Sequence, residues 1–412
     1  MSKVYIQTIA YNAEKTIHRC VESILNQTYK GEIRWDILDN GSTDHTFSIL
    51  SDYMQQDERL NLLHIDHNCD PQNETELAVW NRFYRRSGLT SFNGEYYCTL
   101  DSDDAYHVDF LEKTLAFIKE NNLDMAAVGN DFVDGATNKT VHVRKLNHNI
   151  ILSDANTFDG YFQHYHQFFR TVWGKVYKMS LLKDYVRNDE LSYGSDTWFA
   201  FYTARQAQRI GVLADSLHKY YRSPKSVSHQ WDQKRILSDR ILHEATRDFL
   251  IEKCGTVSRQ NEDYQLAIYT NAIRDTLNVL INASTPLREK IEGVIDIANN
   301  AYTRQLIARE EFCFNPDAVQ EMFKMRKDVV SAAANWLLSL NEVPDDLIEG
   351  YCNTGELLCA SVENADGWLH FKKLRVHFFL EQNRKEEAKK SLQELSELIP
   401  NDLDVMDFQK CF

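Results

Sequence analysis

Carboxylates crowd one short segment of the chain, where Asp101, Asp103 and Asp104 follow the stretch EYYCTL (95–100). The aromatic and β-branched residues of that stretch predict a buried strand. Carboxylate oxygens are the ligands that Mg²⁺ and Mn²⁺ prefer, and these cations commonly bridge to substrate phosphates. Adjacent carboxylates without a cation would repel one another. The segment therefore predicts a divalent-metal site, while an acidic start to the helix 107–120, capped by Asp103 or Asp104, explains the same residues equally well.

A second polar cluster ends another predicted strand, in the segment RWDILDNGSTDHT (34–46). Asp39 could accept a hydrogen bond from the imide or amine edge of a nucleobase, and Gly41 permits a tight turn. The alternative is an ordinary connection from strand to helix, in which Ser42 or Asp44 caps the helix.

These clusters need a sheet to bring them together, and the surrounding pattern predicts one. Strand-like segments alternate with helical patterns, and the strands are expected at 4–10, 33–39, 60–66, 95–101 and 124–130. Such alternation predicts an α/β fold with a mainly parallel sheet flanked by helices, where ligands bind beyond the carboxyl ends of the strands. The first strand leads into Ala10-Tyr11-Asn12, so three polar clusters should share one sheet edge.

From residue 235 onward the pattern is helical, and 412 residues exceed the size of a single core, so we expect two domains, 1–234 and 235–412. Within the second, the segment 368–405 has two amphipathic helices around a turn at Gln382-Asn383. It resembles one tetratricopeptide-type repeat. The all-α domain is expected to recruit the molecule on which the first domain acts, its acceptor, or a second copy of the chain. The alternative is that these helices cover an apolar face of the first domain.

The composition narrows the class of protein. The net charge of −15 opposes a nucleic-acid surface. The eight cysteines form no CxxC pair, so buried, reduced thiols are expected rather than disulfides or a zinc site. The N-terminus lacks the pattern of a signal peptide, and no stretch of about 18 apolar residues could span a bilayer. A cytoplasmic protein is expected, with peripheral membrane association and homo-oligomerisation left open.

Four motifs in this order resemble the family-2 glycosyltransferases of GT-A fold: IAYN (9–12), LDNGSTD (38–44), NGEYY (93–97) and TLDSDD (99–104). Three later segments resemble the family's acceptor-side segment, its catalytic-carboxylate helix and its donor-closing loop: VWGKVYKMSLL (172–182), YGSDTWFAF (193–201) and YYRSPKSVSHQW (220–231). The resemblance covers residues 3–231. It implies a GT-A type, mainly parallel sheet flanked by helices.

The resemblance also implies roles for individual residues. Asp196 matches the general base that deprotonates the acceptor hydroxyl in inverting enzymes. Asp103 would ligate Mn²⁺ or Mg²⁺, with His229 as a second ligand or as an exposed loop residue. The nucleotide-sugar contacts would be Ala10, Tyr11, Asn12, Asp39, Asn40, Gly41, Asp101, Ser102, Asp103, Trp173, Lys175, Arg222 and Lys225.

Some residues depart from the family pattern or allow another role. Many relatives have proline at Ala10, aspartate at Asn40 and Ala-Arg-Asn at 79–81, so the phosphate contacts stay open. Trp173 could face a sugar or pack in the core. The HxH pair, His164 and His166, has metal-like spacing, although in this family such residues usually face the sugar or acceptor.

The expected function is inverting, metal-dependent transfer of a sugar from a nucleotide-diphosphate donor, expected to be UDP-linked, to a hydroxyl group. The acceptor would be a cell-envelope glycan or a surface or flagellar protein. Two alternatives stay open. One is a catalytically silent GT-A fold acting as a binding or scaffold module. The other is a nucleotidyltransferase, which should carry a glycine- and basic-rich loop after the first strand, and the segment AYNAEKTIHR (10–19) lacks it.

Overall fold

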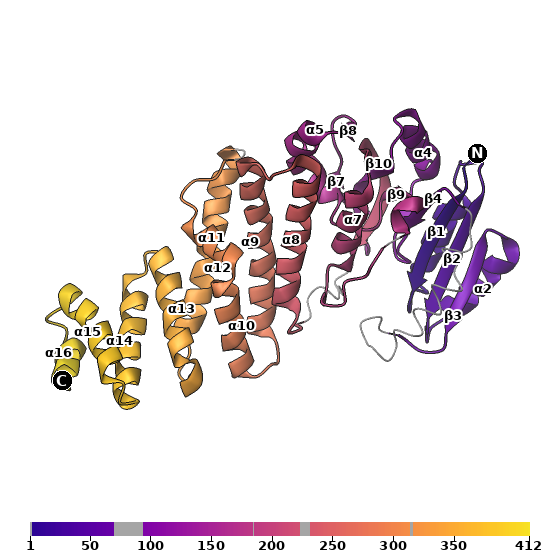
Figure 1. Ribbon diagram of the computed structural model, residues 1–412. Coiled ribbons are helices and arrows are strands. Elements are labelled where there is room, and N and C mark those ends of the chain that lie inside the picture. The colour runs from indigo at the N-terminus through magenta and orange to yellow at the C-terminus, as the bar shows by residue number, and fades with distance from the viewer. Residues whose placement is uncertain (1, 70–93, 184, 223–230, 314–315) are drawn as a thin grey trace. The chain divides into compact units, whose positions relative to one another are not determined.

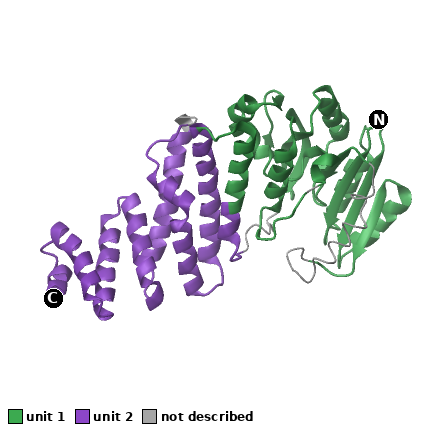
Figure 2. Ribbon diagram, in the orientation of Figure 1, with its two compact units in different colours: residues 1–228, 241–258 green, residues 229–240, 259–412 purple. Residues whose placement is uncertain are grey.

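The computed structural model describes residues 2–69, 94–183, 185–222, 231–313 and 316–412. The chain divides into two compact units (Figure 2): residues 1–228 with 241–258, and residues 229–240 with 259–412. The boundary expected at residue 235 coincides with the start of helix α8 (Arg235–Cys254), whose residues from Ile241 onward group with the first unit. The assignment of separate roles to the two parts stays a prediction.

The first unit is built on a mixed sheet (Figure 1), with the strand order β3-β2-β1-β4-β9-β6-β10-β5. The strands of this path are β1 (Val4–Ala10), β2 (Ile33–Asn40), β3 (Leu60–Ile65), β4 (Tyr96–Thr99), β5 (Ala105–Tyr106), β6 (Met125–Asp134), β9 (Lys175–Lys178) and β10 (Ile210–Arg222). Strands β7 (Thr140–Arg144) and β8 (Ile150–Leu152) pair antiparallel with β6 and β10. The run β3-β2-β1-β4 and the pair β6-β10 are parallel. The predicted α/β class is confirmed.

Register places the polar clusters at one edge of the parallel run. Ala10 at the end of β1 lies opposite Asp39 of β2, and Asp39 lies opposite His64 of β3. On the other side of β1, Gln7 lies opposite Thr99, the last residue of β4. Because these strands run in the same direction, the segments that follow them emerge at the same edge.

Helices cover the sheet and supply its core. They are α1 (Ile17–Leu25), α2 (Thr46–Gln56), α4 (Phe110–Glu120), α5 (Ala155–Gly160), α6 (Phe162–Tyr165) and α7 (Ser195–Gln206), with 3₁₀ turns η1 (His166–Phe168) and η2 (Met179–Leu182). Helix α1 buries Ile17, Cys20, Val21 and Ile24, the spacing of a helix face that packs on a sheet. Strand β2 is buried along nearly its whole length, as expected for a strand covered on both faces.

The acidic segment does not start a helix. Strand β5 separates Asp104 from α4, whose N-cap residue is Asp109. The interpretation of Asp103 or Asp104 as a helix cap is therefore wrong, because the chain first adds a short strand beside β10.

The second unit is helical (Figure 1). It contains α9 (Arg259–Asn282), α10 (Leu287–Asn299), α11 (Ala301–Ala308), α12 (Pro316–Leu338), η4 (Asp345–Leu347), α13 (Ile348–Ser361), α14 (Ala365–Glu381), α15 (Lys385–Leu398) and α16 (Leu403–Gln409). The predicted turn at Gln382-Asn383 is confirmed, since α14 ends at Glu381 and Asn383 takes a φ of 56°. Whether this pair is a tetratricopeptide-type repeat stays a prediction.

The sequence predicted buried, reduced cysteines and no membrane-spanning segment, and the structure bears on both predictions. No disulfide joins any of the eight cysteines, all of which lie among the described residues, and the buried ones are Cys20, Cys69, Cys98, Cys352 and Cys359. Cys313 and Cys411 are instead exposed, and Cys254 is half-buried. Within the described residues, every helix is too short or too polar to cross a membrane.

Candidate active site

The acidic cluster forms the loop that follows β4. One carboxylate oxygen each from Asp101, Asp103 and Asp104 lies within 4.8 Å of the others. Helix α1 fixes the backbone of this loop, because Arg19 Nε donates to the Asp103 carbonyl at 2.9 Å and Thr16 Oγ1 donates to the Ser102 carbonyl at 3.2 Å. These two contacts hold the loop through backbone carbonyls and leave the carboxylates of Asp101 and Asp103 unused.

Asp104 has a different environment from its two neighbours. It is fully buried, and the Tyr221 N–H donates to its Oδ1 at 2.8 Å. His218 Nε2 lies 3.3 Å from Oδ2, and burial lowers the pKa of His218 to about 3, so this imidazole is neutral. Burial raises the pKa of Asp104 well above its usual range. Asp104 therefore ties the loop to β10.

Asp101 and Asp103 are only partly buried, unlike Asp104, so their carboxylates fit a divalent cation. Burial and the charges of Asp104, Asp196 and Asp103 raise the pKa of Asp101 well above its usual range. A cation bound here would relieve that repulsion, and hard oxygen ligands suit Mg²⁺ or Mn²⁺.

Asp196 reaches the same site from the first turn of α7. Gly194 precedes it with a φ of 76°, and a Cβ at Gly194 would lie 2.4 Å from Leu242 Cδ1. Burial raises the pKa of Asp196, whereas the charge of Lys175 and the N–H of Val172 lower it. Asp196 is thus close enough to the acidic loop for its charge to raise the pKa of Asp101.

The side chains of Lys175 and Trp173, both predicted to contact the nucleotide sugar, are buried in the structure. Lys175 is 1% exposed, and its Nζ donates to the Trp173 carbonyl at 3.1 Å and to Thr171 Oγ1 at 3.1 Å. Trp173 is buried and stacks on His218 and Tyr220, with ring centroids 4.5 and 5.2 Å away. Core packing, one of the two roles left open for Trp173, is the arrangement found.

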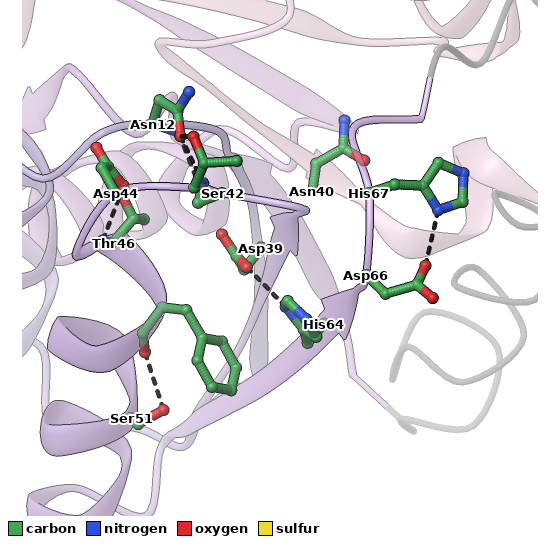
Figure 3. Close-up of polar contacts among 12 residues, drawn as sticks. Asn12, Asp39, Asn40, Ser42, Asp44, Thr46, Ser51, His64, Asp66 and His67 are labelled. Atoms are coloured by element: carbon green, nitrogen blue, oxygen red, sulfur yellow. Dashed lines mark hydrogen bonds and ion pairs between the residues drawn. The ribbon is translucent and has the colours of Figure 1, made fainter.

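The residues predicted to bind the nucleobase lie at the ends of β1 and β2. Ala10 is buried, and Tyr11 after it is exposed. Asp39 is fully buried, and its Oδ2 lies 2.7 Å from His64 Nδ1 (Figure 3). Asp39 Oδ1 has no hydrogen-bond partner among the described residues. A buried oxygen in this state is a place where a ligand N–H can bind.

The turn after β2 is tightly built. Gly41 has a φ of 72°, and a Cβ there would lie 2.1 Å from the His67 carbonyl carbon. The Asn12 N–H donates to Ser42 Oγ at 3.0 Å, and the Thr43 N–H donates to Asn12 Oδ1 at 2.8 Å (Figure 3). These contacts tie the turn to the end of β1.

Two further polar residues of this region also hold the chain. The Asn40 side chain donates to the Cys69 carbonyl and accepts from the Cys69 N–H, both at 3.0 Å. Asp44 Oδ1 accepts from the Thr46 N–H at 2.9 Å, but the N-cap residue of α2 is His45, so neither Ser42 nor Asp44 is the N-cap residue. Asn12 and Asn40 thus position the turn, and their contact with a donor stays a prediction.

The structure describes only some of the remaining predicted residues. Arg222 is the last residue of β10, and Lys225, His229 and the segment 79–81 lie outside the described residues. His166 is buried against Phe162 and Phe201, and burial lowers its pKa to about 3. Across the described part of the chain, the acidic cluster is the one metal-like group of three, so the HxH pair is not part of such a group.

The sequence interpretation missed several residues that shape this site, among them Arg19, His64 and His218. In the sequence, Arg19 falls on the polar face of a predicted helix, and such a face is expected to be exposed to solvent. His64 is one polar residue within the apolar segment LNLLHID (60–66), and only the pairing of β3 with β2 places it opposite Asp39.

Comparison with known proteins shows which protein family the first unit resembles. The model of the family described as glycosyl transferase family 2 matches residues 5–75 and 84–186, the part of the chain that holds the acidic cluster. Glycosyltransferase GlyA of Streptococcus pneumoniae serotype 4 is 24% identical over 363 residues, covering 82% of this chain and 50% of GlyA. The first unit is therefore similar to glycosyl transferase family 2 over the matched residues.

TarS of Staphylococcus aureus, a poly(ribitol-phosphate) β-N-acetylglucosaminyltransferase, is 25% identical over 285 residues, covering 66% of this chain and 44% of TarS. A crystal structure of S. aureus TarS 1–349 in complex with UDP matches with a TM-score of 0.44 and 18% identity, covering 89% of each chain. The chain therefore spans about half the length of GlyA and less of TarS.

Proposed function

We propose that this protein is a glycosyltransferase that moves a sugar from a nucleotide-diphosphate donor, expected to be UDP-linked, to a hydroxyl group with inversion. One observation carries the proposal: the loop after β4 presents the acidic pair Asp101 and Asp103, and the half-buried Asp196 of α7 is close enough for its charge to raise the pKa of Asp101. The match of residues 5–75 and 84–186 to the model of glycosyl transferase family 2 supports the same class of reaction. Glycan biosynthesis at the cell envelope is the proposed setting, with a surface or flagellar protein as the other acceptor class.

Asp101 and Asp103 would hold a divalent cation, which when bound neutralises charge on the leaving diphosphate. The chain's own part is to keep both carboxylates open at a fixed place. Arg19 and Thr16 do this through backbone carbonyls, and Asp104 anchors the end of the loop to Tyr221.

Asp196 would accept the proton of the acceptor hydroxyl as that oxygen attacks the anomeric carbon. Burial raises the pKa of this carboxyl, which strengthens it as a base. The nearby Lys175 charge and the Val172 N–H oppose that effect and favour the ionised form. The balance suits a base that must be ionised yet reactive near neutral pH.

We further propose that the helical unit recruits the acceptor or a second copy of the chain. Its last two helices expose the large apolar side chains Leu398, Leu403 and Met406, and Phe412 beyond α16 is exposed as well. Exposed apolar groups of this kind, close together in sequence, favour contact with another surface.

Release of nucleotide from candidate sugar donors in the presence of Mn²⁺ tests the proposed function. A transferase hydrolyses its donor slowly or transfers to an added acceptor, and the reaction stops in Asp196→Asn. A silent binding module would bind the donor without turnover in either protein. A nucleotidyltransferase would instead release pyrophosphate from a nucleoside triphosphate.

A further inference from the structure

His64 contacts Asp39 directly, across the parallel pair β2 and β3. Its Nδ1 lies 2.7 Å from Asp39 Oδ2, and Figure 3 shows the two side chains pointing toward one another. The His64 side chain is 41% exposed, whereas that of Asp39 is 0% exposed. The pair therefore joins a buried carboxylate to a ring that faces solvent.

The chemistry of the pair fixes which atom donates. A carboxylate oxygen only accepts, so Nδ1 carries the hydrogen and donates it to Oδ2. Oδ2 is thereby satisfied, and the carboxylate is held against rotation. Oδ1 is left buried and unpartnered among the described residues. A buried acceptor without a donor is costly, so the site favours a ligand that supplies an N–H at that point.

The His64 ring is itself held in place. Phe47, in the first turn of α2, lies against it with ring centroids 4.5 Å apart and ring planes at 49°. The adjacent turn is fixed by Gly41, which packs on the backbone of His67. His64 is thus braced on one side by an aromatic ring and on the other by its hydrogen bond to Asp39.

We propose that His64 is a positioning residue that sets nucleobase specificity by holding Asp39 with Oδ1 presented as a fixed acceptor. A uracil ring offers an imide N–H to such an acceptor. The equivalent ring nitrogen of cytosine is itself an acceptor, so it would face Oδ1 without a hydrogen. His64 therefore favours uridine over cytidine diphosphates. This inference rests on the proposed function, because it concerns the same donor site.

The test uses the full chain and compares UDP with CDP by calorimetric titration in Mn²⁺. A matched pair of variants separates position from polarity. The side-chain N–H of asparagine can occupy the place of Nδ1, whereas the glutamine side chain carries its N–H farther out, near the place of Nε2. We expect His64→Asn to keep the preference for UDP. We expect His64→Gln to weaken UDP binding about tenfold or more, with little change for CDP, the worth of a hydrogen bond to a charged group.

Two further variants complete the design. Phe47→Ala removes the brace but leaves the hydrogen bond, so it should lower the UDP preference less than His64→Gln. His148→Ala, at an exposed position between β7 and β8, should leave the preference unchanged. In turnover assays, His64→Gln should raise the donor KM and leave kcat near wild type, because binding and not chemistry is affected.

The outcomes separate this inference from the proposed function. A wild-type chain that prefers UDP, with the same preference in His64→Gln, overturns the role of His64 and leaves the glycosyltransferase proposal intact. A wild-type chain that binds neither nucleotide overturns both. Loss of the UDP preference in His64→Gln, together with its retention in His64→Asn, supports the inference.

Discussion

The buried ammonium group of Lys175 opposes the effect of burial on Asp196. Burial raises the pKa of the Asp196 carboxyl, and the charge of Lys175 is the largest influence that lowers it. Burial in turn lowers the pKa of Lys175 to about 7. A residue that the sequence assigned to the donor therefore acts, in the structure, on the electrostatics of the proposed base.

This relationship predicts a shift in the pH dependence of turnover. In Lys175→Met, Asp196 loses an influence that lowers its pKa, so its ionisation moves to higher pH. The acidic limb of the kcat profile should move in the same direction. Measuring kcat against pH for both proteins checks this. An acidic limb at the same pH in both proteins would show that Lys175 does not influence the ionisation of Asp196.

Lys175 should also make the stability depend on pH. Its pKa in the folded chain, about 7, lies below the ordinary value of 10.5, so between these values the unfolded chain binds more protons. The free energy of unfolding should therefore rise with pH from about 7 to about 10. Chemical denaturation across this range should show a smaller rise in Lys175→Met than in wild type, and equal slopes would rule the effect out.

Asp103→Ala is expected to remove the metal-dependent part of donor binding while the chain stays folded. The loop is held through its backbone by Arg19, so loss of this accessible carboxylate leaves those contacts in place. Titration of UDP with Mn²⁺ and with a chelator should give similar affinities in the variant. Asp52→Ala, at an exposed position on α2, is the control and should bind as wild type does. Undiminished metal dependence in Asp103→Ala would remove this residue from the cation site.

Gly41→Ala should lower the free energy of unfolding by about 2 kcal/mol or more, because the new Cβ meets rigid backbone and the φ is unfavourable for alanine. The clash is with the carbonyl carbon of His67, 2.1 Å from the ideal Cβ position. Gly160→Ala is the control, since a Cβ there meets nothing within 4 Å. Equal midpoints for the two variants in urea would show that the turn relaxes freely.

The sequence predicted the sheet and the shared edge because both follow from periodicity and from strand direction. It could not place residues whose roles depend on the pairing of distant strands. His64 is an example, since its partner Asp39 is identified only by the register of β2 and β3. Trp173 and Lys175 are others. Their segment turns at Gly174, which has a φ of 65°, and both side chains are buried, which periodicity over so short a segment does not indicate.

Asp196 is proposed to act as the base in sugar transfer, beside a nucleotide-binding edge of the sheet. The most direct measurement is nucleotide release from a UDP-sugar by the full chain in Mn²⁺, compared between wild type and Asp196→Asn, with UDP affinity measured in parallel. We expect near-equal affinity and a loss of turnover of about 10²–10⁴-fold in the variant, the usual contribution of a positioned general base. Turnover at the wild-type rate in Asp196→Asn would contradict this role.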